Sequence, residues 1–296
     1  MASPSASIDR CAQPAGVSPD GRHNFKDPPS LQNAVYGVSF TLTGIAVLLV
    51  LGRVWMNKRK LGRTDYVALS AATLELGFLS AIIARQYYRH QWDIPACWLD
   101  ESYIKILFCN SLTFGLSLGL AKVAILLLYL DLFSVYERMR IAIFAGLAFT
   151  IGLYVTFIPC VSYFQAPHIG DSWSDLVANG QLSRVVPWTM VIGVGSILID
   201  LYIFILPIPV LLRLQLSTSK RLRLVSLFGI ALFGVAASIV ALVYRVPLLA
   251  PSNMLTSGID YTWHLAQIYI VNMVECNVPL SIACLPFCVL LVDLPP

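Results

Sequence analysis

Seven long apolar stretches, separated by short polar connections, fill almost all of the chain after residue 30. Each is longer than the roughly 20 helical residues that cross a hydrocarbon core about 30 Å thick. Continuous apolar runs such as Ile45–Leu51 and Ile125–Leu130 are unlike the alternating pattern of a membrane barrel. The pattern therefore predicts an all-α membrane protein, a seven-transmembrane helix bundle. The predicted spans are Leu31–Val54, Tyr66–Tyr88, Tyr103–Leu132, Ile141–Phe164, Trp188–Leu212, Leu224–Ala250 and Thr262–Val292.

The sequence before the first span has a different character. It is polar and rich in Pro, Ser and Gly, and it lacks the apolar core of a signal peptide. We expect residues 1–30 to form a flexible N-terminal tail, and residues 31–296 to form one seven-helix transmembrane domain. No further cytosolic domain is expected after the seventh helix.

Charge sets the expected orientation. Charged residues make up only 12% of the chain, against about 25% in a soluble domain. Eleven Lys and Arg residues lie in or next to the odd-numbered connections, and six lie in the tail and the even-numbered connections. The positive-inside rule therefore predicts an external N-terminus and a cytosolic C-terminus. The net charge of +4 is then explained by the lipid bilayer as partner, without nucleic acid. Plasma membrane and internal membranes are not distinguished.

Four ionisable residues fall near the middle of predicted spans: Glu75, Lys122, Asp200 and Glu275. A charge at this depth costs about 2.5–3.5 kcal/mol on insertion scales, so each needs a partner or a function. Glu75 and Lys122 are predicted to lie at similar depths, about 15 Å from the cytosolic ends of their helices. They could form an ion pair that only fixes helix packing, or they could belong to a polar ligand-binding cluster with Asp200 and Glu275.

Asp200 and Glu275 are the candidate catalytic residues. Lys122 is the only basic residue predicted at mid-membrane, so it cannot balance every acid. An uncompensated carboxyl could be protonated, and it could then donate a hydrogen bond or act as a general acid. Arg245 is predicted near the outer end of its span, where we interpret it as extending to the interface.

Two further patterns concern packing and covalent links. The spacing of Gly115 and Gly119 favours a close contact between helices. Cys97 and Cys160 are both predicted near the outer face, where oxidation is permitted. They could form a disulfide, or they could remain unpaired thiols together with Cys11. The chain has no CxxC pair and no His/Cys cluster at metal-ligand spacing, so we predict no metal site.

Several short motifs, in order along about residues 31–292, resemble one family. They are Arg53-Val-Trp55, Thr64-Asp65-Tyr66, Lys122 to Tyr129, Asp200 with Leu206-Pro-Ile-Pro209, Lys220–Arg223, and Glu275 with Ala283-Cys-Leu-Pro286. The chain resembles the fungal seven-helix rhodopsin-domain proteins. That family includes receptor-like proteins and integral membrane proteins of secondary-metabolite clusters, satratoxin clusters among them.

The resemblance implies a multi-pass fungal membrane protein that accompanies secondary-metabolite (mycotoxin-type) biosynthesis and binds a lipophilic small molecule. One alternative is a membrane-embedded cyclase or isomerase with Asp200 or Glu275 as general acid, and another is a receptor-like sensor of a small ligand. A transporter is disfavoured because the chain shows no repeated halves. No cofactor is expected, since a retinal Schiff base needs a lysine and the seventh span has none.

Overall fold

The structure, a computed structural model, describes residues 10–84, 87–133, 136–178, 184–211, 218–249 and 260–292. Side chains are described in all of these ranges except 210–211, 218–228 and 286–292. The side chains of Lys220–Arg223 and Pro286, which contributed to the resemblance above, therefore lie outside the described residues.

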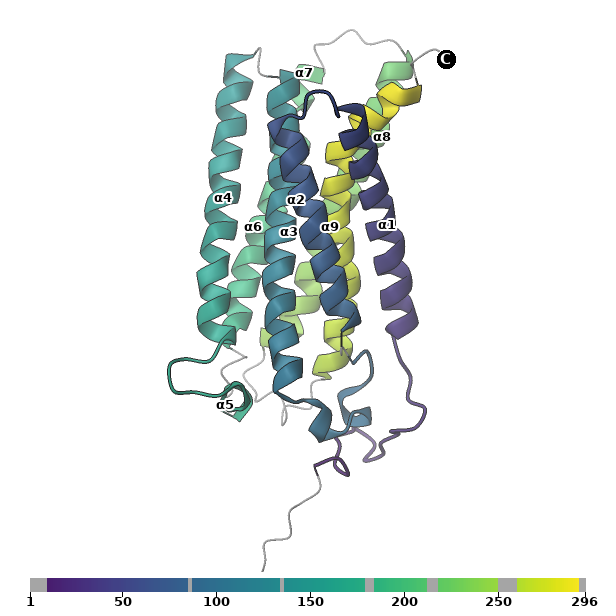
Figure 1. Cartoon of the computed structure of the whole chain (residues 1–296), viewed down its shortest axis with the longest axis vertical. Coiled ribbons are helices and arrows are strands. Elements are labelled where there is room, and N and C mark those ends of the chain that lie inside the picture. The colour runs from purple at the N-terminus through teal and green to yellow at the C-terminus, as the bar shows by residue number, and fades with distance from the viewer. Residues whose placement is uncertain are drawn as a thin grey trace, which may run out of the picture.

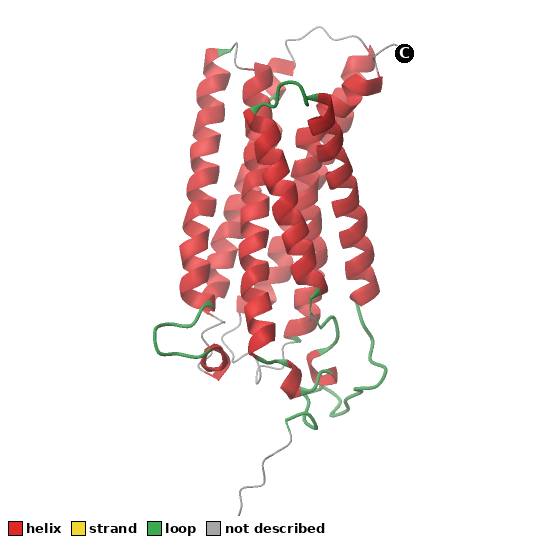
Figure 2. Ribbon diagram, viewed as in Figure 1, coloured by secondary structure: helices red, strands yellow, loops and turns green. Residues whose placement is uncertain are grey.

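Long helices run side by side along the whole length of the molecule (Figures 1 and 2). The long helices are α1 (Gln32–Met56), α2 (Arg63–Ile83), α3 (Glu101–Phe133), α4 (Glu137–Gln165), α6 (Val186–Ile205), α8 (Thr218–Arg245) and α9 (Tyr261–Val292). The shorter elements are η1 (Gln91–Asp93), η2 (Ala96–Trp98), α5 (Trp173–Ala178), α7 (Ile208–Leu211) and η4 (Val246–Leu249). Within the described residues there are only two isolated β-bridges and no strand. The predicted all-α bundle is confirmed.

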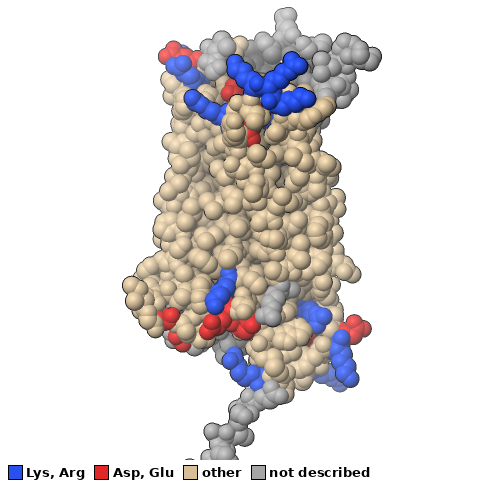
Figure 3. Space-filling view, viewed as in Figure 1, with Lys and Arg blue, Asp and Glu red and all other residues tan. Residues whose placement is uncertain are grey.

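Seven of the helices are long and apolar enough to cross a membrane. Large apolar side chains such as Leu48, Phe149 and Val243 point outward and are more than half exposed. On the face shown in Figure 3, charged side chains gather near both ends of the molecule, and the surface between them is an uncharged band. A bilayer covers such a band, because lipid solvates apolar side chains but not charges. The protein is therefore an integral multi-pass membrane protein.

Helix α9 lies inside the bundle, in contact with α1, α2, α3 and α8. It is the most enclosed of the candidate spans: 72% of the residues in an apolar 18-residue stretch are buried, against 28% in such a stretch of α1. This position explains why α9 carries polar residues at mid-depth: its side chains meet other helices and not lipid.

Three helices, α2, α6 and α8, end several residues before the prediction; α8 ends at Arg245 and is followed by η4. Helix α2 ends at Ile83, and Tyr88 belongs to the following connection, where its carbonyl oxygen accepts a hydrogen bond of 2.8 Å from Leu31 N. Helix α6 ends at Ile205, and the short α7 follows it. Pro207 lies between them, and proline has no N–H to continue the helical ladder. The apolar run around Leu206 hides the end of α6, whereas Arg85 and Gln86, which lie inside the predicted second span, were a signal for the earlier end of α2.

One end of the bundle is covered by residues 10–30 and 87–100, which we call the capped end (bottom of Figure 1). The N-terminal segment is bonded to the second connection there: Ala15 N donates to Ile94 O (2.8 Å) and Asn24 N donates to Asp93 Oδ1 (2.7 Å). We expected a flexible tail, but residues 10–30 are held by these bonds. Composition could not reveal it, because the bonds are made mostly by the backbone.

A disulfide joins Cys11 to Cys97 across the capped end. Of the two alternatives for Cys97 and Cys160, the disulfide between them is therefore wrong: Cys97 is bonded to Cys11, and Cys160 is a free thiol on α4. The prediction failed because Cys11 was placed in a free tail, whereas the folded tail brings it to Cys97 despite a separation of 86 residues.

The second connection also holds the start of α9. The Asp260 carboxylate bonds to the His90 ring and accepts a 2.9 Å hydrogen bond from Gln91 N. The His90 ring is stacked between Trp92 and Trp263, with centroids 4.7 and 4.1 Å away. The first residues of α9 are thus fixed to the capped end.

The opposite end, which we call the basic end, carries Lys58, Arg59, Lys60 and Arg63 around the α1–α2 turn. Figure 3 shows blue side chains gathered at this end, at the top of the view. Arg53 is buried just below them. Its Nε bonds Asp65 Oδ1 at 2.6 Å, and its Nη1 donates to the carbonyl oxygen of Ala283 on α9. This cluster joins α1, α2 and α9.

The predicted glycine contact is confirmed. Gly115 and Gly119 on α3 face Phe157 and Tyr154 on α4. A Cβ atom at position 115 would lie 2.2 Å from Phe157 Cε1, and one at 119 would lie 2.8 Å from Tyr154 Cγ. The missing side chains therefore let α3 and α4 approach closely.

Candidate functional site

Five side chains from four helices form a closed hydrogen-bonded circuit inside the bundle, which we call the polar ring. Its members are Lys122 on α3, Ser196 and Asp200 on α6, Ser238 on α8 and Glu275 on α9. Sequence reasoning selected three of them, Lys122, Asp200 and Glu275, and the fold brings these three together.

Lys122 provides the positive charge of the ring. Its side chain is fully buried. Its Nζ donates to Asp200 Oδ1 at 2.6 Å, Ser196 Oγ at 2.7 Å and the Ser196 carbonyl oxygen at 3.0 Å. An ammonium has three N–H donors, so all three are used. The ion pair with Asp200 offsets the cost of placing both charges in the bundle.

Glu275 closes the ring through two serines. Ser196 Oγ donates to Glu275 Oε1 at 2.6 Å, and Ser238 Oγ lies 3.1 Å from the same oxygen. Ser238 Oγ also lies 2.6 Å from Asp200 Oδ2. A hydroxyl has one proton to donate, so Ser238 can serve only one of the two carboxylates at a time. The ring therefore has two arrangements of nearly the same geometry.

Glu75 lies outside this ring. Its two carboxylate oxygens accept hydrogen bonds from Ser117 Oγ (2.7 Å) and Asn277 Nδ2 (2.8 Å). The predicted Glu75–Lys122 ion pair is wrong, because Lys122 pairs with Asp200. The depths of the two residues were compatible with a pair, but depth does not fix the direction in which a side chain leaves its helix.

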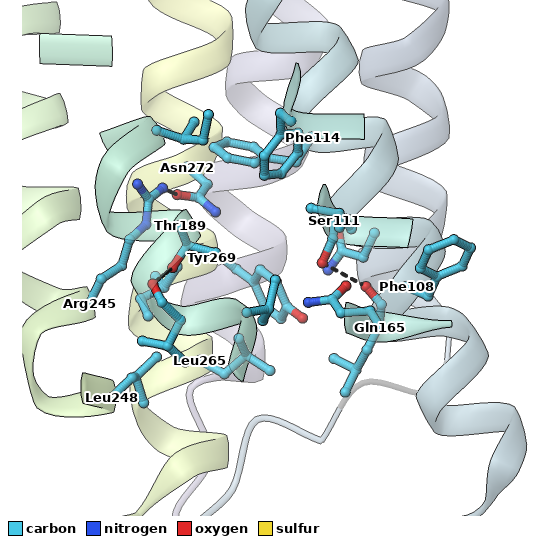
Figure 4. Close-up of a pocket in the computed structure, with 18 of the residues that line it drawn as sticks. Phe108, Ser111, Phe114, Gln165, Thr189, Arg245, Leu248, Leu265, Tyr269 and Asn272 are labelled. Atoms are coloured by element: carbon cyan, nitrogen blue, oxygen red, sulfur yellow. Dashed lines mark hydrogen bonds between the residues drawn. The ribbon is translucent and has the colours of Figure 1, made fainter. Parts of the chain in front are cut away.

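A cavity of about 130 Å³ lies between the polar ring and the capped end. Most of its wall is apolar and aromatic, and its polar lining residues come from α3, α4, α6, α8 and α9 (Figure 4). Figure 4 shows Arg245 and Asn272 on one side, Ser111 and Gln165 on the other, and Tyr269 between them. An apolar pocket with a few converging polar groups is the usual form of a small-molecule site.

Arg245 connects this cavity to the polar ring. It lines the cavity and is 7% exposed. Its Nη2 donates to Asn272 Oδ1 at 2.8 Å and lies 3.6 Å from Glu275 Oε2. The interpretation of Arg245 as an interface residue is wrong: its side chain points into the bundle, with the guanidinium 5.7 Å from the Phe114 ring.

A signal for this arrangement was present in the sequence. Arg245 is seven residues from Ser238, and Asn272 is three residues from Glu275. Both spacings place side chains on one helix face. Each spacing links a residue at the cavity to one in the ring.

Two amide oxygens at the cavity have no hydrogen-bond donor among the described residues: Asn110 Oδ1 and Gln165 Oε1. Asn110 is 3% exposed. A buried polar atom without a partner costs about 1–3 kcal/mol, so such atoms at a cavity mark positions where a bound molecule can supply the missing donor.

The residues at this site do not fit retinal, the cofactor that the word rhodopsin implies. Lys122 is the only described lysine near the middle of the membrane-spanning part, and its three donors are all engaged. It does not line the cavity, which is also far smaller than a long polyene requires.

The architecture defines a class: a seven-helix membrane protein with an internal cavity next to a buried charge network. The family model for the fungal rhodopsin domain matches residues 31–294. The chain therefore belongs to the fungal rhodopsin domain family, as the resemblance indicated. Neither a curated protein nor a solved structure matches it.

Proposed function

We propose that this protein binds a small lipophilic molecule in the cavity and passes the effect of binding to the polar ring through Arg245. The observation that carries the proposal is the position of Arg245, which lines the cavity and contacts Glu275. A ligand that draws the guanidinium toward itself weakens its hold on Glu275. The two serine-linked carboxylates can then redistribute their hydrogen bonds.

The cavity volume limits the ligand. At about 130 Å³, the space resembles an engineered cavity of about 150 Å³ that holds benzene. Drug-sized ligands need pockets of about 300–1,000 Å³. A complete mycotoxin-type product therefore exceeds this space, and the ligand is a smaller molecule.

Binding has more support than catalysis. Asp200 and Glu275 were the candidate general acids, but neither lines the cavity. Their carboxylates already bond Lys122, Ser196 and Ser238. A general acid must come within hydrogen-bond reach of its substrate, so we assign Asp200 and Glu275 to the polar ring and favour the sensor alternative over a cyclase or isomerase.

The orientation proposed for this function places the capped end outside or in a lumen and the basic end in the cytosol. The basic residues support it through the positive-inside rule. The Cys11–Cys97 disulfide supports it independently, since disulfides persist in oxidising compartments. A reporter fused after Pro296 should report the cytosol, and an external signal would reverse the assignment.

Binding is tested by purifying the protein from fungal membranes and identifying co-purifying small molecules by mass spectrometry. Ser111→Phe fills the cavity with a ring, and Ser70→Phe places the same ring on the exposed face of α2 as a matched control. We expect one or more small molecules with wild type and Ser70→Phe and none with Ser111→Phe. Identical extracts from all three would refute the proposal.

The association with secondary-metabolite biosynthesis stays a prediction from the family resemblance. It is tested by metabolite profiling of a deletion strain, with transcripts of the metabolite genes measured alongside. A sensor predicts reduced transcripts and a uniform loss of the pathway products. One accumulating precursor with normal transcripts would instead indicate a missing chemical step and return Asp200 and Glu275 to a catalytic role.

A further inference from the structure

We infer that the ligand of this cavity is an uncharged molecule about the size of a substituted benzene ring, carrying a hydroxyl group. The inference rests on the proposed function and specifies the chemistry that the cavity recognises. It follows from three properties of the wall: its shape and apolar character, its charge balance and its unpartnered acceptors.

The apolar part of the wall selects a ring. Phe78, Phe114 and Phe157 all line the cavity, on α2, α3 and α4. Phe78 and Phe114 contact each other, with ring centroids 5.5 Å apart. Aromatic side chains pack well against the face or edge of another ring, and the volume admits roughly one ring with a short substituent.

The charge balance selects a neutral molecule. Arg245 is the charged residue that lines the cavity, and Glu275 lies 3.6 Å from it. Lys122 and Asp200 balance each other in the polar ring. An anion bound at Arg245 would compete with Glu275 and leave an excess negative charge inside the membrane, and a cation would be repelled by Arg245. Both outcomes are costly in a low-dielectric interior.

The polar atoms select a hydroxyl group. Asn110 Oδ1 and Gln165 Oε1 require a donor. Arg245 has five N–H donors, and its one hydrogen bond to a described residue is to Asn272. A hydroxyl both donates and accepts, so it can satisfy an amide oxygen while accepting from a neighbouring donor. A ketone or ether only accepts and would leave the amide oxygens without partners.

The test uses four probes of nearly equal size: benzyl alcohol, ethylbenzene, benzoate and benzylammonium. Each is titrated into the full-length protein in lipid nanodiscs, and binding is measured by equilibrium dialysis. Binding to nanodiscs that carry the Ser111→Phe protein is subtracted, because this variant retains the lipid but not the cavity. We expect benzyl alcohol to bind about tenfold more tightly than ethylbenzene, the equivalent of one hydrogen bond, and neither ion to bind above the subtracted level.

Two variants assign the hydroxyl contact. Gln165→Met and Asn110→Leu remove an acceptor and keep similar volume. Each should reduce the preference for benzyl alcohol over ethylbenzene while ethylbenzene binding is retained, which shows that the cavity is intact. Gln165 is the last residue of α4, so its replacement disturbs the helix least and remains informative if Asn110→Leu does not fold.

The outcomes distinguish a failure of the proposed function from a failure of the inferred ligand class. If no probe binds wild type above the Ser111→Phe level, the proposed function itself fails. If ethylbenzene binds as tightly as benzyl alcohol, or if an ion binds best, the cavity is a binding site but the inferred ligand class is wrong. An unchanged preference in both amide variants would also overturn the inference.

Discussion

Arg245 Nη2 lies 3.6 Å from Glu275 Oε2, inside the membrane-spanning part of the protein. This contact joins two structures that would otherwise be separate, the cavity near the capped end and the polar ring at mid-depth. The Oε2 atom has no hydrogen-bond donor among the described residues, so the charge of Arg245 is its main compensation. The proposed coupling between the cavity and the polar ring depends on this pair.

Removing Arg245 should destabilise the protein through Glu275. Arg245→Met leaves a buried carboxylate without its counter-charge, and breaking a buried pair in this way costs about 3–5 kcal/mol. Thermal unfolding in detergent should show a clear fall in Tm. The double variant Arg245→Met/Glu275→Gln removes both charges and should recover much of this loss.

The comparison of single and double variants isolates the interaction between Arg245 and Glu275. If Arg245→Met and its double variant with Glu275→Gln unfolded at the same temperature, Arg245 would not compensate Glu275, and its link to the polar ring would be lost.

The two buried acids Asp200 and Glu75 should respond differently to amide replacement. Asp200→Asn leaves Lys122 without its ion-pair partner and should cost about 3–5 kcal/mol. Glu75→Gln should cost less than about 1 kcal/mol, because its amide oxygen can keep the bond from Asn277 Nδ2, while the Ser117 hydroxyl can accept from the new amide N–H and donate to Ala71 O. Tm values of the two variants, measured side by side, check this order. A larger fall in Tm for Glu75→Gln than for Asp200→Asn would instead indicate that Glu75 forms the ion pair with Lys122 that the sequence suggested.

Close packing of α3 on α4 should make Gly115 intolerant of a methyl group. The Cβ of Gly115→Ala would overlap the Phe157 ring, and overpacking of this kind costs about 1–3 kcal/mol. Because Phe157 also lines the cavity, probe binding should weaken as well. Gly152→Ala on α4 is the control: it meets nothing within 4 Å and should leave Tm equal or slightly raised. Equal Tm values for the two alanine variants would contradict the close contact.

The Cys11–Cys97 disulfide predicts that replacing a bonded cysteine raises the number of free thiols, whereas replacing a free cysteine lowers it. Cys11→Ser should free the Cys97 thiol and so add one alkylatable thiol to the unreduced, denatured protein. Cys97→Ser should likewise free Cys11, whereas Cys160→Ser should remove one thiol because Cys160 is already free. Intact-mass spectrometry after alkylation reads each change directly. A gain of one thiol in Cys160→Ser would show that Cys160 is bonded instead.

The sequence determined the bundle but not the partners inside it. Span length and apolarity predicted seven helices, and the cost of buried charge selected Lys122, Asp200 and Glu275, which the fold brings together. Pairing depends on the rotation of each helix about its own axis. A membrane helix that meets other helices on several sides, as α3 does, has little amphipathic pattern from which to read that rotation, and Lys122 on α3 was therefore paired with Glu75 instead of Asp200.

The cavity was harder to predict than the charges. Its walls are ordinary apolar residues from several helices, and their chemistry is the same whether they pack tightly or leave a space. Asn110 and Gln165, two of the polar residues at the cavity, are neutral and so escaped a search for ionisable groups, and Arg245 was interpreted as an interface residue. The capped end was missed for a related reason, because its contacts are mainly backbone hydrogen bonds and one long-range disulfide.

The most direct test of the central claim is to locate a ligand in the protein. The protein is crystallised with 4-bromobenzyl alcohol, and anomalous scattering from bromine gives the position of the probe. We predict a peak inside the cavity, between Gln165 and Asn272, with the hydroxyl within hydrogen-bond distance of an amide oxygen. A bromine peak only on the lipid-facing surface, in crystals where the probe is bound, would contradict the account.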